Sequence, residues 1–306
     1  MREFGACPLP RLLCLAGATA TGKSALAQYL AERHGAAILS ADAMLVYRGM
    51  DIGTAKPTAD ERARVPYYGL DCVTPADPFS VAQWLERARA VPTDRPIIAV
   101  GGTGLYFSAR LRGLDETAPA DPARRAELAA LPLPELQARL APHRDRLPPG
   151  DWANPRRLVR ALEILESGRS LPDRWIAAPK PPLLALTWPR PLLHERIVRR
   201  VQAMYRDGLL DETEALLRRH PVWSPTARGA IGYAEAADCL AGRCTREEAM
   251  ERTIIRTRQL ARRQETYLRH QFDVTWLPAV PGDTPETLAP RLLDALTHKA
   301  SPANKG

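Results

Sequence analysis

The sequence predicts an α/β fold, in which helices flank a parallel sheet, with a smaller all-helical insertion domain. Three observations predict it: a glycine-rich loop lies between the first apolar strand and a helix, apolar strands then alternate with helices, and residues 114–182 are rich in Arg and Pro. Alternation is typical of parallel sheets, because parallel strands need a long crossover connection. We therefore expect a core of residues 1–113 and 183–306, helical in its C-terminal part, and an insertion of residues 114–182.

The glycine-rich loop at residues 17–24 matches G-x-x-x-x-G-K-[ST], with an apolar strand at 12–16 before it and helix-favouring residues after it. This is the P-loop motif in its required context, so the expected core is a P-loop-type parallel sheet. The glycines let backbone N–H groups face a phosphate, and the helix N-terminus adds positive dipole charge. Lys23 supplies a full charge, and Ser24 is placed to hold a magnesium ion. The loop residues predicted to bind a diphosphate or triphosphate are Gly17, Ala18, Thr19, Ala20, Thr21, Gly22, Lys23 and Ser24.

Three later apolar segments predict further strands of the sheet, at residues 36–40, 95–100 and 183–188. The first of them is followed by Asp42, and the second by Thr103. Loops at the carboxyl ends of parallel strands gather at one edge of the sheet. We therefore expect the P-loop, Asp42 and Thr103 to line one crevice.

The insertion and the C-terminal part read as basic helices. Helices are predicted at 122–131 and at 154–168, the second with Asn154 as N-cap and with a buried face of Leu158, Leu162 and Leu165. A long helix is predicted at 247–270, with Met250, Ile254, Ala261 and Leu268 at core spacing. Its arginines form two rows, which are Arg252, Arg256 and Arg263, and Arg258, Arg262 and Arg269. The small, polar residues 300–306 predict a disordered tail.

Composition limits the class of protein. The 306 residues are 45% hydrophobic and carry a formal net charge of +8, which in a phosphate-binding protein favours a polyanionic partner. No stretch is long and apolar enough for a membrane span or a secretion signal, so we expect a cytoplasmic protein that makes no membrane contact, and a monomer. No C-x-x-C spacing indicates a disulfide framework or a zinc site among the five cysteines, Cys7, Cys14, Cys72, Cys239 and Cys244.

Several segments together resemble the tRNA dimethylallyltransferase family. They are the P-loop at 17–24, the long block SADAMLVYRGMDIGTAKP at 40–57, VGGTGLY at 100–106, NPRRLVRALE at 154–163, AIGY at 230–233 and TRQLARRQETY at 257–267. The resemblance covers nearly the whole chain. The chain departs from the family pattern at five positions, which are Ala43, Leu45, Arg156, Arg262 and Tyr267.

The resemblance implies transfer of a dimethylallyl group from dimethylallyl diphosphate to the exocyclic amine of the adenosine 3′-adjacent to the anticodon, with release of diphosphate. It implies Mg²⁺ as cofactor and the anticodon stem-loop of tRNA as partner. An adenine amine is a poor nucleophile, so a nearby carboxylate can act as general base, and Asp42 is the candidate. Thr103 would assist Asp42, and Arg228 would complete the diphosphate site. The residues expected to contact tRNA are Asp42, Ala43, Met44, Leu45, Thr103, Arg125, Arg156, Arg157, Leu158, Val159, Arg160, Arg256 and Arg263.

Other interpretations stay open on the sequence alone. Asp42 could cap the following turn, Thr103 could cap the following helix, and Arg228 could form a surface ion pair. The protein could instead prenylate a free adenine nucleotide, although the basic helices favour tRNA. It could be a small-molecule P-loop kinase, but Gly101-Gly102 stands where many such enzymes carry a Walker-B acid, and no short lid is evident. A nucleotide-binding regulator without catalytic activity is a more distant alternative.

Overall fold

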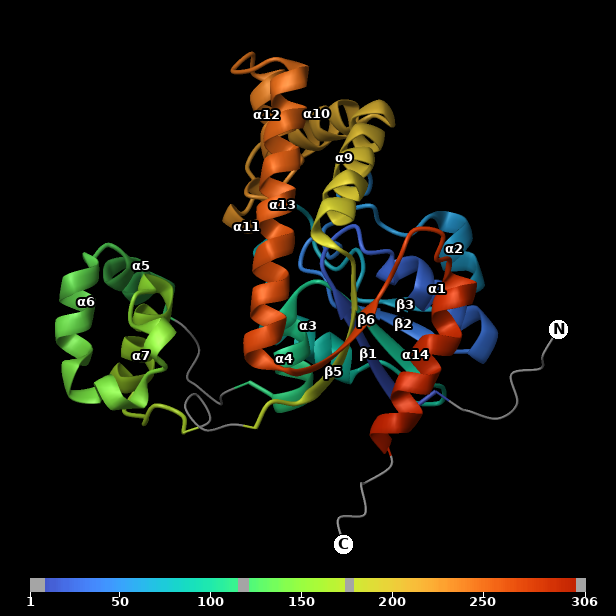
Figure 1. Cartoon of the computed structure of the whole chain (residues 1–306). Coiled ribbons are helices and arrows are strands. Elements are labelled where there is room, and N and C mark those ends of the chain that lie inside the picture. The colour runs from blue at the N-terminus through green and yellow to red at the C-terminus, as the bar shows by residue number, and fades with distance from the viewer. Residues whose placement is uncertain (1–8, 115–120, 174–178, 301–306) are drawn as a thin grey trace, which may run out of the picture. The chain divides into compact units, whose positions relative to one another are not determined.

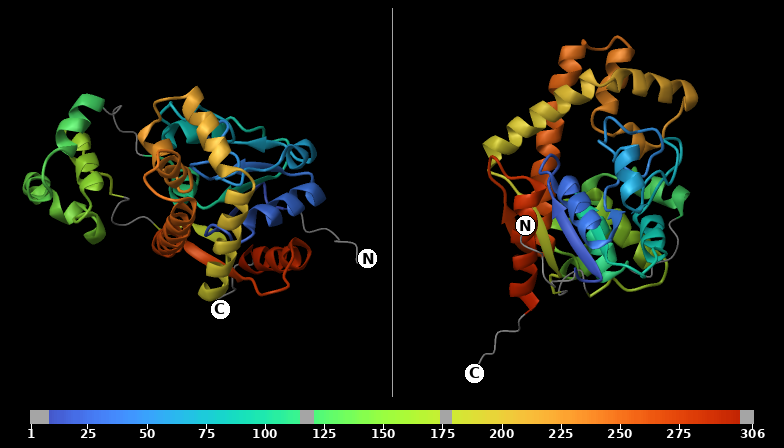
Figure 2. Two further views of the ribbon diagram at one scale, coloured as in Figure 1. Left: turned by 90° about the horizontal axis from the view of Figure 1, so that it is seen from above. Right: turned by 90° about the vertical axis from the view of Figure 1, so that its right-hand side faces the viewer.

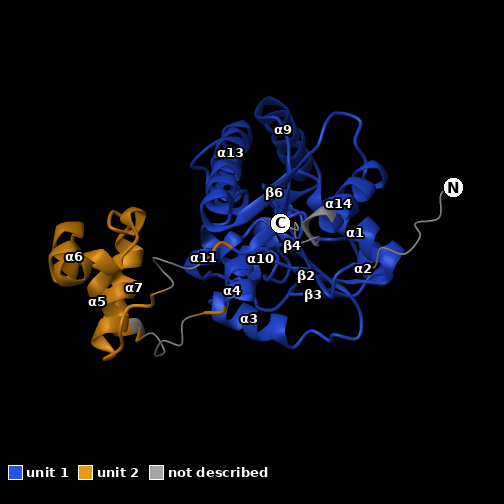
Figure 3. Ribbon diagram, turned by 60° about the horizontal axis from the view of Figure 1, so that its bottom comes forward, with its two compact units in different colours: residues 1–112, 181–306 blue, residues 113–180 orange. Residues whose placement is uncertain are grey.

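The chain folds into two compact units, described here from a computed structural model (Figure 1). The structure describes residues 9–114, 121–173 and 179–300, so of the expected tail at 300–306 only Ala300 is described, and it is helical. Unit 1 comprises residues 1–112 and 181–306, and unit 2 comprises residues 113–180 (Figure 3). These boundaries lie one or two residues from those expected on composition.

A six-stranded parallel sheet forms the centre of unit 1, and this confirms the predicted fold class. The order of the strands is β3-β2-β4-β1-β5-β6, which places the P-loop strand β1 in the interior of the sheet. Two strands, β3 and β6, were not predicted, because one has only two residues and the other has a single buried residue. The strands are β1 (Leu12–Gly17), β2 (Ala37–Ser40), β3 (Tyr67–Tyr68), β4 (Ile97–Gly101), β5 (Pro182–Thr187) and β6 (Asp273–Pro278).

Helices cover both faces of this sheet. Helix α1 packs against α14 on one face, and α3 packs against α4 on the other, as right-handed crossovers require (Figures 1 and 2). Trp84 of α3 stacks on Tyr106 of α4 with ring centroids 4.4 Å apart, and its indole N–H donates to the Ser40 carbonyl at 2.8 Å. The flanking helices are α1 (Lys23–His34), α2 (Ala59–Arg64), α3 (Val81–Arg89), α4 (Gly104–Arg112) and α14 (Pro285–Ala300).

The C-terminal half of unit 1 is helical and extends beyond one edge of the sheet (Figures 1 and 2). The predicted long helix is present as α13, and its predicted core positions Ala261 and Leu268 are buried. Nearer its N-terminus the buried positions are Ala249, Thr253 and Thr257, whereas the predicted Met250 and Ile254 are only partly buried. The two threonines can be buried because their hydroxyls donate to carbonyls one turn earlier, at 2.8 and 2.7 Å. These helices are α9 (Arg190–Arg206), α10 (Leu209–Arg219), α11 (Pro225–Arg228), α12 (Tyr233–Leu240) and α13 (Arg246–Gln271).

Unit 2 is all-helical and has an apolar core of its own. Its helices are α5 (Pro122–Ala129), α6 (Leu133–Leu140) and α7 (Pro155–Glu166), with two short 3₁₀ helices at 141–146 and 149–151. Asn154 occupies the N-cap position of α7 without a capping side-chain hydrogen bond. The core is formed by Leu128, Leu136, Leu140, Leu147, Leu158, Val159, Ala161, Leu162, Ile164 and Leu171.

Candidate active site

The P-loop turns from the end of β1 into the start of α1, as its motif predicts. Gly17 lies against β5, where a Cβ atom would be 2.7 Å from the Leu186 carbonyl oxygen. Gly22 forms the N-cap of α1 with φ of +93°, in the left-handed region that glycine tolerates. The N-terminus of a twelve-residue helix therefore opens directly at the loop.

Side chains from distant parts of unit 1 hold this loop in place. The contacts are Lys23 Nζ to the Ala18 carbonyl at 3.0 Å, Trp188 Nε1 to the Thr21 carbonyl at 2.8 Å, Arg196 Nε to the Ala20 carbonyl at 2.8 Å, and the Thr19 N–H to Gln264 Oε1 at 2.9 Å. Three of the four side chains come from β5, α9 and α13 or the residues that join them. The C-terminal half of the chain is therefore part of the phosphate-binding structure.

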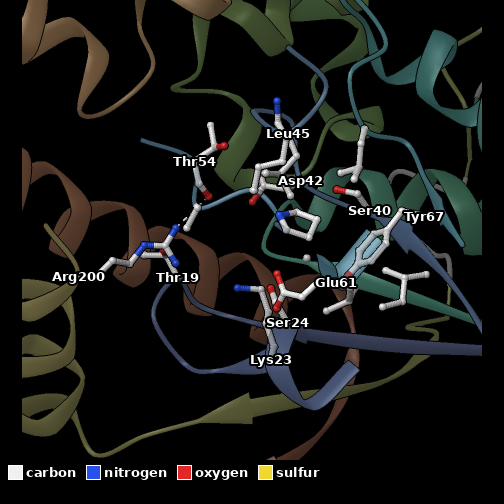
Figure 4. A pocket seen from close by; sticks show the side chains of 17 residues that line it. Thr19, Lys23, Ser24, Ser40, Asp42, Leu45, Thr54, Glu61, Tyr67 and Arg200 are labelled. Carbon is white, nitrogen blue, oxygen red and sulfur yellow. Dashed lines mark hydrogen bonds between the residues drawn. The ribbon is translucent and has the colours of Figure 1, made fainter. Parts of the chain in front are cut away.

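A pocket opens between the P-loop and the carboxyl end of β2 (Figure 4). Residues two apart on β2 line it, because alternate side chains of a strand share one face. The lining includes the apolar residues Ile38, Val100 and Leu70. The remaining lining residues are Thr19, Lys23, Ser24, Ser40, Asp42, Leu45, Thr54, Ala55, Lys56, Pro57, Glu61, Tyr67, Gly101 and Arg200.

Two cations of the pocket lining, Lys23 and Arg200, interact electrostatically with the carboxylate of Asp42. Lys23 is only 8% exposed, and this burial lowers the pKa of its ammonium to about 8, while the charge of Asp42 acts in the opposite direction. Burial also lowers the pKa of Arg200, and Asp42 again opposes the shift. Arg200 Nη2 donates to the Thr54 carbonyl at 3.1 Å. Lys23 and Arg200 thus offer two positive charges to an anion bound at the loop.

Thr103 contacts the segment that carries Asp42, but unlike Asp42 it is not among the residues that line the pocket. Asp42 Oδ1 accepts the Met44 N–H at 2.9 Å, and Thr103 Oγ1 accepts the Ala43 N–H at 3.0 Å. The hydroxyl of Thr103 is therefore used on the segment that carries Asp42 and makes no cap to the helix that follows it. Gly101 permits this approach of the two strand ends, since a Cβ atom there would lie 2.1 Å from the Ala41 carbonyl oxygen.

A buried lysine fixes the outer wall of the pocket. The side chain of Lys56 is fully buried, and its ammonium contacts Asp51 Oδ1 at 2.5 Å, Asp71 Oδ1 at 2.7 Å and the Tyr47 carbonyl at 2.7 Å. Arg62 binds the other oxygen of Asp71 at 2.7 Å. These cations hold the pKa of Asp71 below its usual range, although burial alone would raise it. The wall segment 54–57 is thereby held against the body of unit 1.

The oxygen-bearing side chains of the pocket suit a magnesium ion. Ser24 follows the P-loop lysine, and the Oγ atom of Ser40 is buried without a hydrogen-bond partner in the structure. Asp42 and Glu61 add carboxylates to the same lining. Hard oxygen donors of this kind are the ligands that Mg²⁺ prefers. Within the described ranges, no three His, Cys, Asp or Glu residues gather as a metal-binding group.

Arg228, predicted as a diphosphate ligand, lies on α11 with an exposed side chain and does not line the pocket. The pocket contains Arg200 of α9 instead. The role of Arg228 stays a prediction. Arg200 was missed because it is far from Asp42 in sequence, and only its helical spacing from Arg196, on the face beside Leu193 and Ile197, could have singled it out.

The structure places the predicted tRNA contacts of unit 2 in two groups. Leu158 and Val159 are 0% and 5% exposed in the core of the unit, as the predicted buried face requires for Leu158, and their expected contact with tRNA stays a prediction. Arg125 is paired with Glu163 through two contacts of 2.6 and 2.8 Å. The remaining arginines lie at the surface or partly buried, with Arg156 exposed, Arg157 3.9 Å from Asp151, and Arg160 3.2 Å from Glu163.

The two arginines of α13 that were predicted to contact tRNA differ in whether the guanidinium is bound within unit 1. Arg256 forms an ion pair with the buried carboxylate of Glu235 and donates to the Gly229 carbonyl at 3.1 Å. Its guanidinium is thus engaged within unit 1. Arg263 is exposed and has no ion-pair partner in the part of the chain that the structure describes. Of the two, Arg263 is the side chain available to an RNA backbone.

Two family models match the chain. The IPP transferase family model matches residues 45–271, and the isopentenyl transferase model matches residues 10–66.

The chain belongs to the IPP transferase family. It is 44% identical to the tRNA dimethylallyltransferase of Anaeromyxobacter dehalogenans, over 93% of this chain and 97% of that one. The tRNA dimethylallyltransferase of Methylococcus capsulatus is 42% identical over 91% of this chain and 96% of its own length. The solved structure of a tRNA isopentenylpyrophosphate transferase from Bacillus halodurans superposes with a TM-score of 0.66 at 33% identity, covering 94% of this chain and 96% of that chain.

Two further observations on this IPP transferase concern membrane-spanning helices and cysteines. No helix in the described part combines the length and the apolar character that crossing a membrane needs. The cysteines at 14, 72, 239 and 244 are free thiols. Cys7 lies outside the described residues.

Proposed function

We propose that the protein transfers a dimethylallyl group from dimethylallyl diphosphate to the exocyclic amine of the adenosine 3′-adjacent to the anticodon of tRNA, giving N6-isopentenyladenosine and diphosphate. One observation carries the proposal: Lys23, Arg200 and Asp42 share one pocket at a P-loop, in a chain 44% identical to a protein named tRNA dimethylallyltransferase. A pair of cations suits a diphosphate leaving group. A carboxylate beside them suits removal of a proton from an amine.

The P-loop side of the pocket stabilises the leaving group. As the bond between the allylic carbon and the diphosphate oxygen breaks, negative charge develops on that oxygen. The ammonium of Lys23, the guanidinium of Arg200 and the N–H groups at the start of α1 face this charge in a partly buried site. The carbon that is left tolerates partial positive charge because it is allylic.

Asp42 serves as the general base. The amine nitrogen forms its bond to the allylic carbon, and the proton that this nitrogen loses passes to the carboxylate of Asp42. The Met44 N–H holds one carboxylate oxygen at 2.9 Å, and Thr103 holds the neighbouring Ala43 N–H at 3.0 Å, so the base is oriented before the substrate binds. Thr103 acts in this reaction by fixing the segment that carries Asp42.

A magnesium ion would be held by Ser24, with Ser40 and Asp42 within the same lining. Substrate phosphates and water are expected to supply its other ligands, as is usual for this ion. When bound, the ion would neutralise charge on the diphosphate.

We propose tRNA binding through exposed arginines of both units. Arg156 and Arg157 of unit 2 and Arg263 of α13 are the candidates, with Arg160 beside them on α7. The target base must leave the stack of the anticodon loop, which costs a few kcal/mol that backbone contacts must offset. We expect the enzyme to act in the cytoplasm as a monomer.

The experiment that tests the function is incubation with unmodified tRNA and dimethylallyl diphosphate, followed by nucleoside analysis of the digested RNA. Isopentenyladenosine in the anticodon loop is the expected product. Free adenosine monophosphate in place of tRNA tests the nucleotide prenyltransferase, and ATP in place of the prenyl donor tests the kinase. Product formation with adenosine monophosphate alone, or phosphoryl transfer from ATP, would overturn the proposal.

A further inference from the structure

A loop at residues 51–57 forms one wall of the pocket, and its outer end is bound by two helices of the C-terminal half. Thr54, Ala55, Lys56 and Pro57 line the pocket. The N–H groups just before them, at residues 51–53, are bound by side chains of α10 and α12. Three consecutive backbone donors are thus hydrogen-bonded to side chains outside the loop.

The two side chains are Glu212 of α10 and Tyr233 of α12, which we call the clasp. The Glu212 carboxylate accepts the Asp51 N–H at 3.2 Å and the Ile52 N–H at 3.0 Å. The hydroxyl of Tyr233 donates to Glu212 Oε1 at 2.5 Å and accepts the Gly53 N–H at 3.1 Å. Within the described residues, the side-chain hydrogen bonds of the clasp are therefore made to this loop or between Glu212 and Tyr233.

One member of the clasp is buried, and the other, Glu212, is partly exposed. Tyr233 is fully buried, and its ring lies so close to Gly53 that a Cβ atom there would be 2.4 Å from Tyr233 Cε2. Burial and the neighbouring Glu212 carboxylate raise the pKa of Tyr233 far above its usual range. The phenol therefore keeps its proton and acts as a donor toward Glu212 at all physiological pH values.

The loop connects the clasp to Arg200, a charged residue of the pocket. The residue after Gly53 is Thr54, whose carbonyl accepts the hydrogen bond from Arg200 Nη2 at 3.1 Å. Arg200 shares the pocket with Asp42 and Lys23. The position of the Thr54 carbonyl thus decides where the guanidinium lies.

We propose that Glu212 and Tyr233 are positioning residues, which hold the Thr54 carbonyl where it directs Arg200 toward the diphosphate. The inference rests on the proposed function, because it gives Arg200 an anion to bind. Neither member of the clasp lines the pocket. Both act through the loop 51–54.

The decisive variant is Glu212→Gln, which keeps the size of the side chain and removes its charge. Asp211→Asn is the matched control, because Asp211 is its exposed neighbour in the same first turn of α10 and loses the same charge. We expect Glu212→Gln to weaken binding of dimethylallyl diphosphate about 10-fold, the loss typical of a charge-assisted hydrogen bond, with tRNA affinity unchanged. Asp211→Asn should behave as the parent. Equal losses in both variants, or a loss of tRNA affinity alone, would overturn the proposal.

A second measurement tests the route through Arg200. In an Arg200→Lys background, which cannot make the same directed contact, Glu212→Gln should weaken diphosphate binding little further. Full additivity of the two effects contradicts the proposal. If Glu212→Gln does not fold, Tyr233→Phe keeps the buried ring, removes only the hydroxyl and is held to the same criteria.

Calorimetry with inorganic diphosphate, in the absence of tRNA, separates this inference from the proposed function. Weakened diphosphate binding in the clasp variants supports the clasp even if the parent transfers no prenyl group. Unchanged diphosphate binding in an enzyme that does modify tRNA refutes the clasp and leaves the function standing.

Discussion

Replacing Asp42 by Asn should remove the general base and leave the local fold intact. An Asn side chain keeps an oxygen that can accept the Met44 N–H, at 2.9 Å in the parent, and the bond from Ala43 to Thr103 is untouched. The fold of the segment should therefore persist. Loss of a general base typically lowers the rate by ~10²–10⁴-fold, which corresponds to about 3–5 kcal/mol in the barrier.

Whereas the rate should fall in Asp42→Asn, the affinity for diphosphate should rise. The charge of Asp42 acts on both Lys23 and Arg200, and it competes with an incoming anion for them. Removing this charge leaves the two cations free for diphosphate, so affinity should rise at slightly acidic pH, where Lys23 stays protonated.

The assay is single-turnover modification of saturating tRNA, combined with calorimetric titration of inorganic diphosphate. Slow turnover with equal or tighter diphosphate binding is the expected result for Asp42→Asn. Near-parental turnover would remove Asp42 from the mechanism. Slow turnover with weakened diphosphate binding would show that the substitution had disrupted the pocket itself.

Two further predictions concern charge. Diphosphate binds the ammonium form of Lys23, whose pKa is about 8, so the affinity for diphosphate should be constant below that pH and fall as the pH rises through it. Binding titrations from neutral to alkaline pH measure this fall. If a Lys23→Arg variant still shows the same fall, another group causes it. Replacing Arg157 and Arg160 by Ala should weaken tRNA binding and flatten its dependence on salt, because fewer counterions are released. Dimethylallyl diphosphate affinity is the control there, and an unchanged salt slope would show that α7 faces away from the RNA.

The sequence was sufficient where one local signal determined the structure. Four of the strands, the P-loop and the adjacency of Asp42 and Thr103 follow from apolar runs, glycine spacing and the geometry of parallel sheets. In the first half of α13, Thr253 and Thr257 are more buried than the predicted Met250 and Ile254, because the threonine hydroxyls are satisfied within the helix, and polarity alone gives no sign of that.

Residues that act across long sequence distances could not be found in this way. Arg200 reaches the pocket only because β5 and α9 return beside β1, and the structure shows this pairing directly. Leu158 and Val159 were named among the tRNA contacts together with the arginines around them, yet both belong to the core of unit 2, where helical spacing had already placed Leu158. A helix can present basic side chains on one face only by burying the apolar ones between them.

The pairing of β1 with β5 sets an order for assembly on the ribosome. Leu15 pairs with Leu184, so the whole of unit 2 is synthesised before the interior strand gains its second neighbour. At typical rates of translation that interval is on the order of ten seconds, during which one edge of β1 stays open to misassociation. Unit 2, with its own core, can fold in the meantime. Trp188 and Arg196, which hold the P-loop, emerge later still, so the nascent chain completes its phosphate-binding loop only after the insertion has been made.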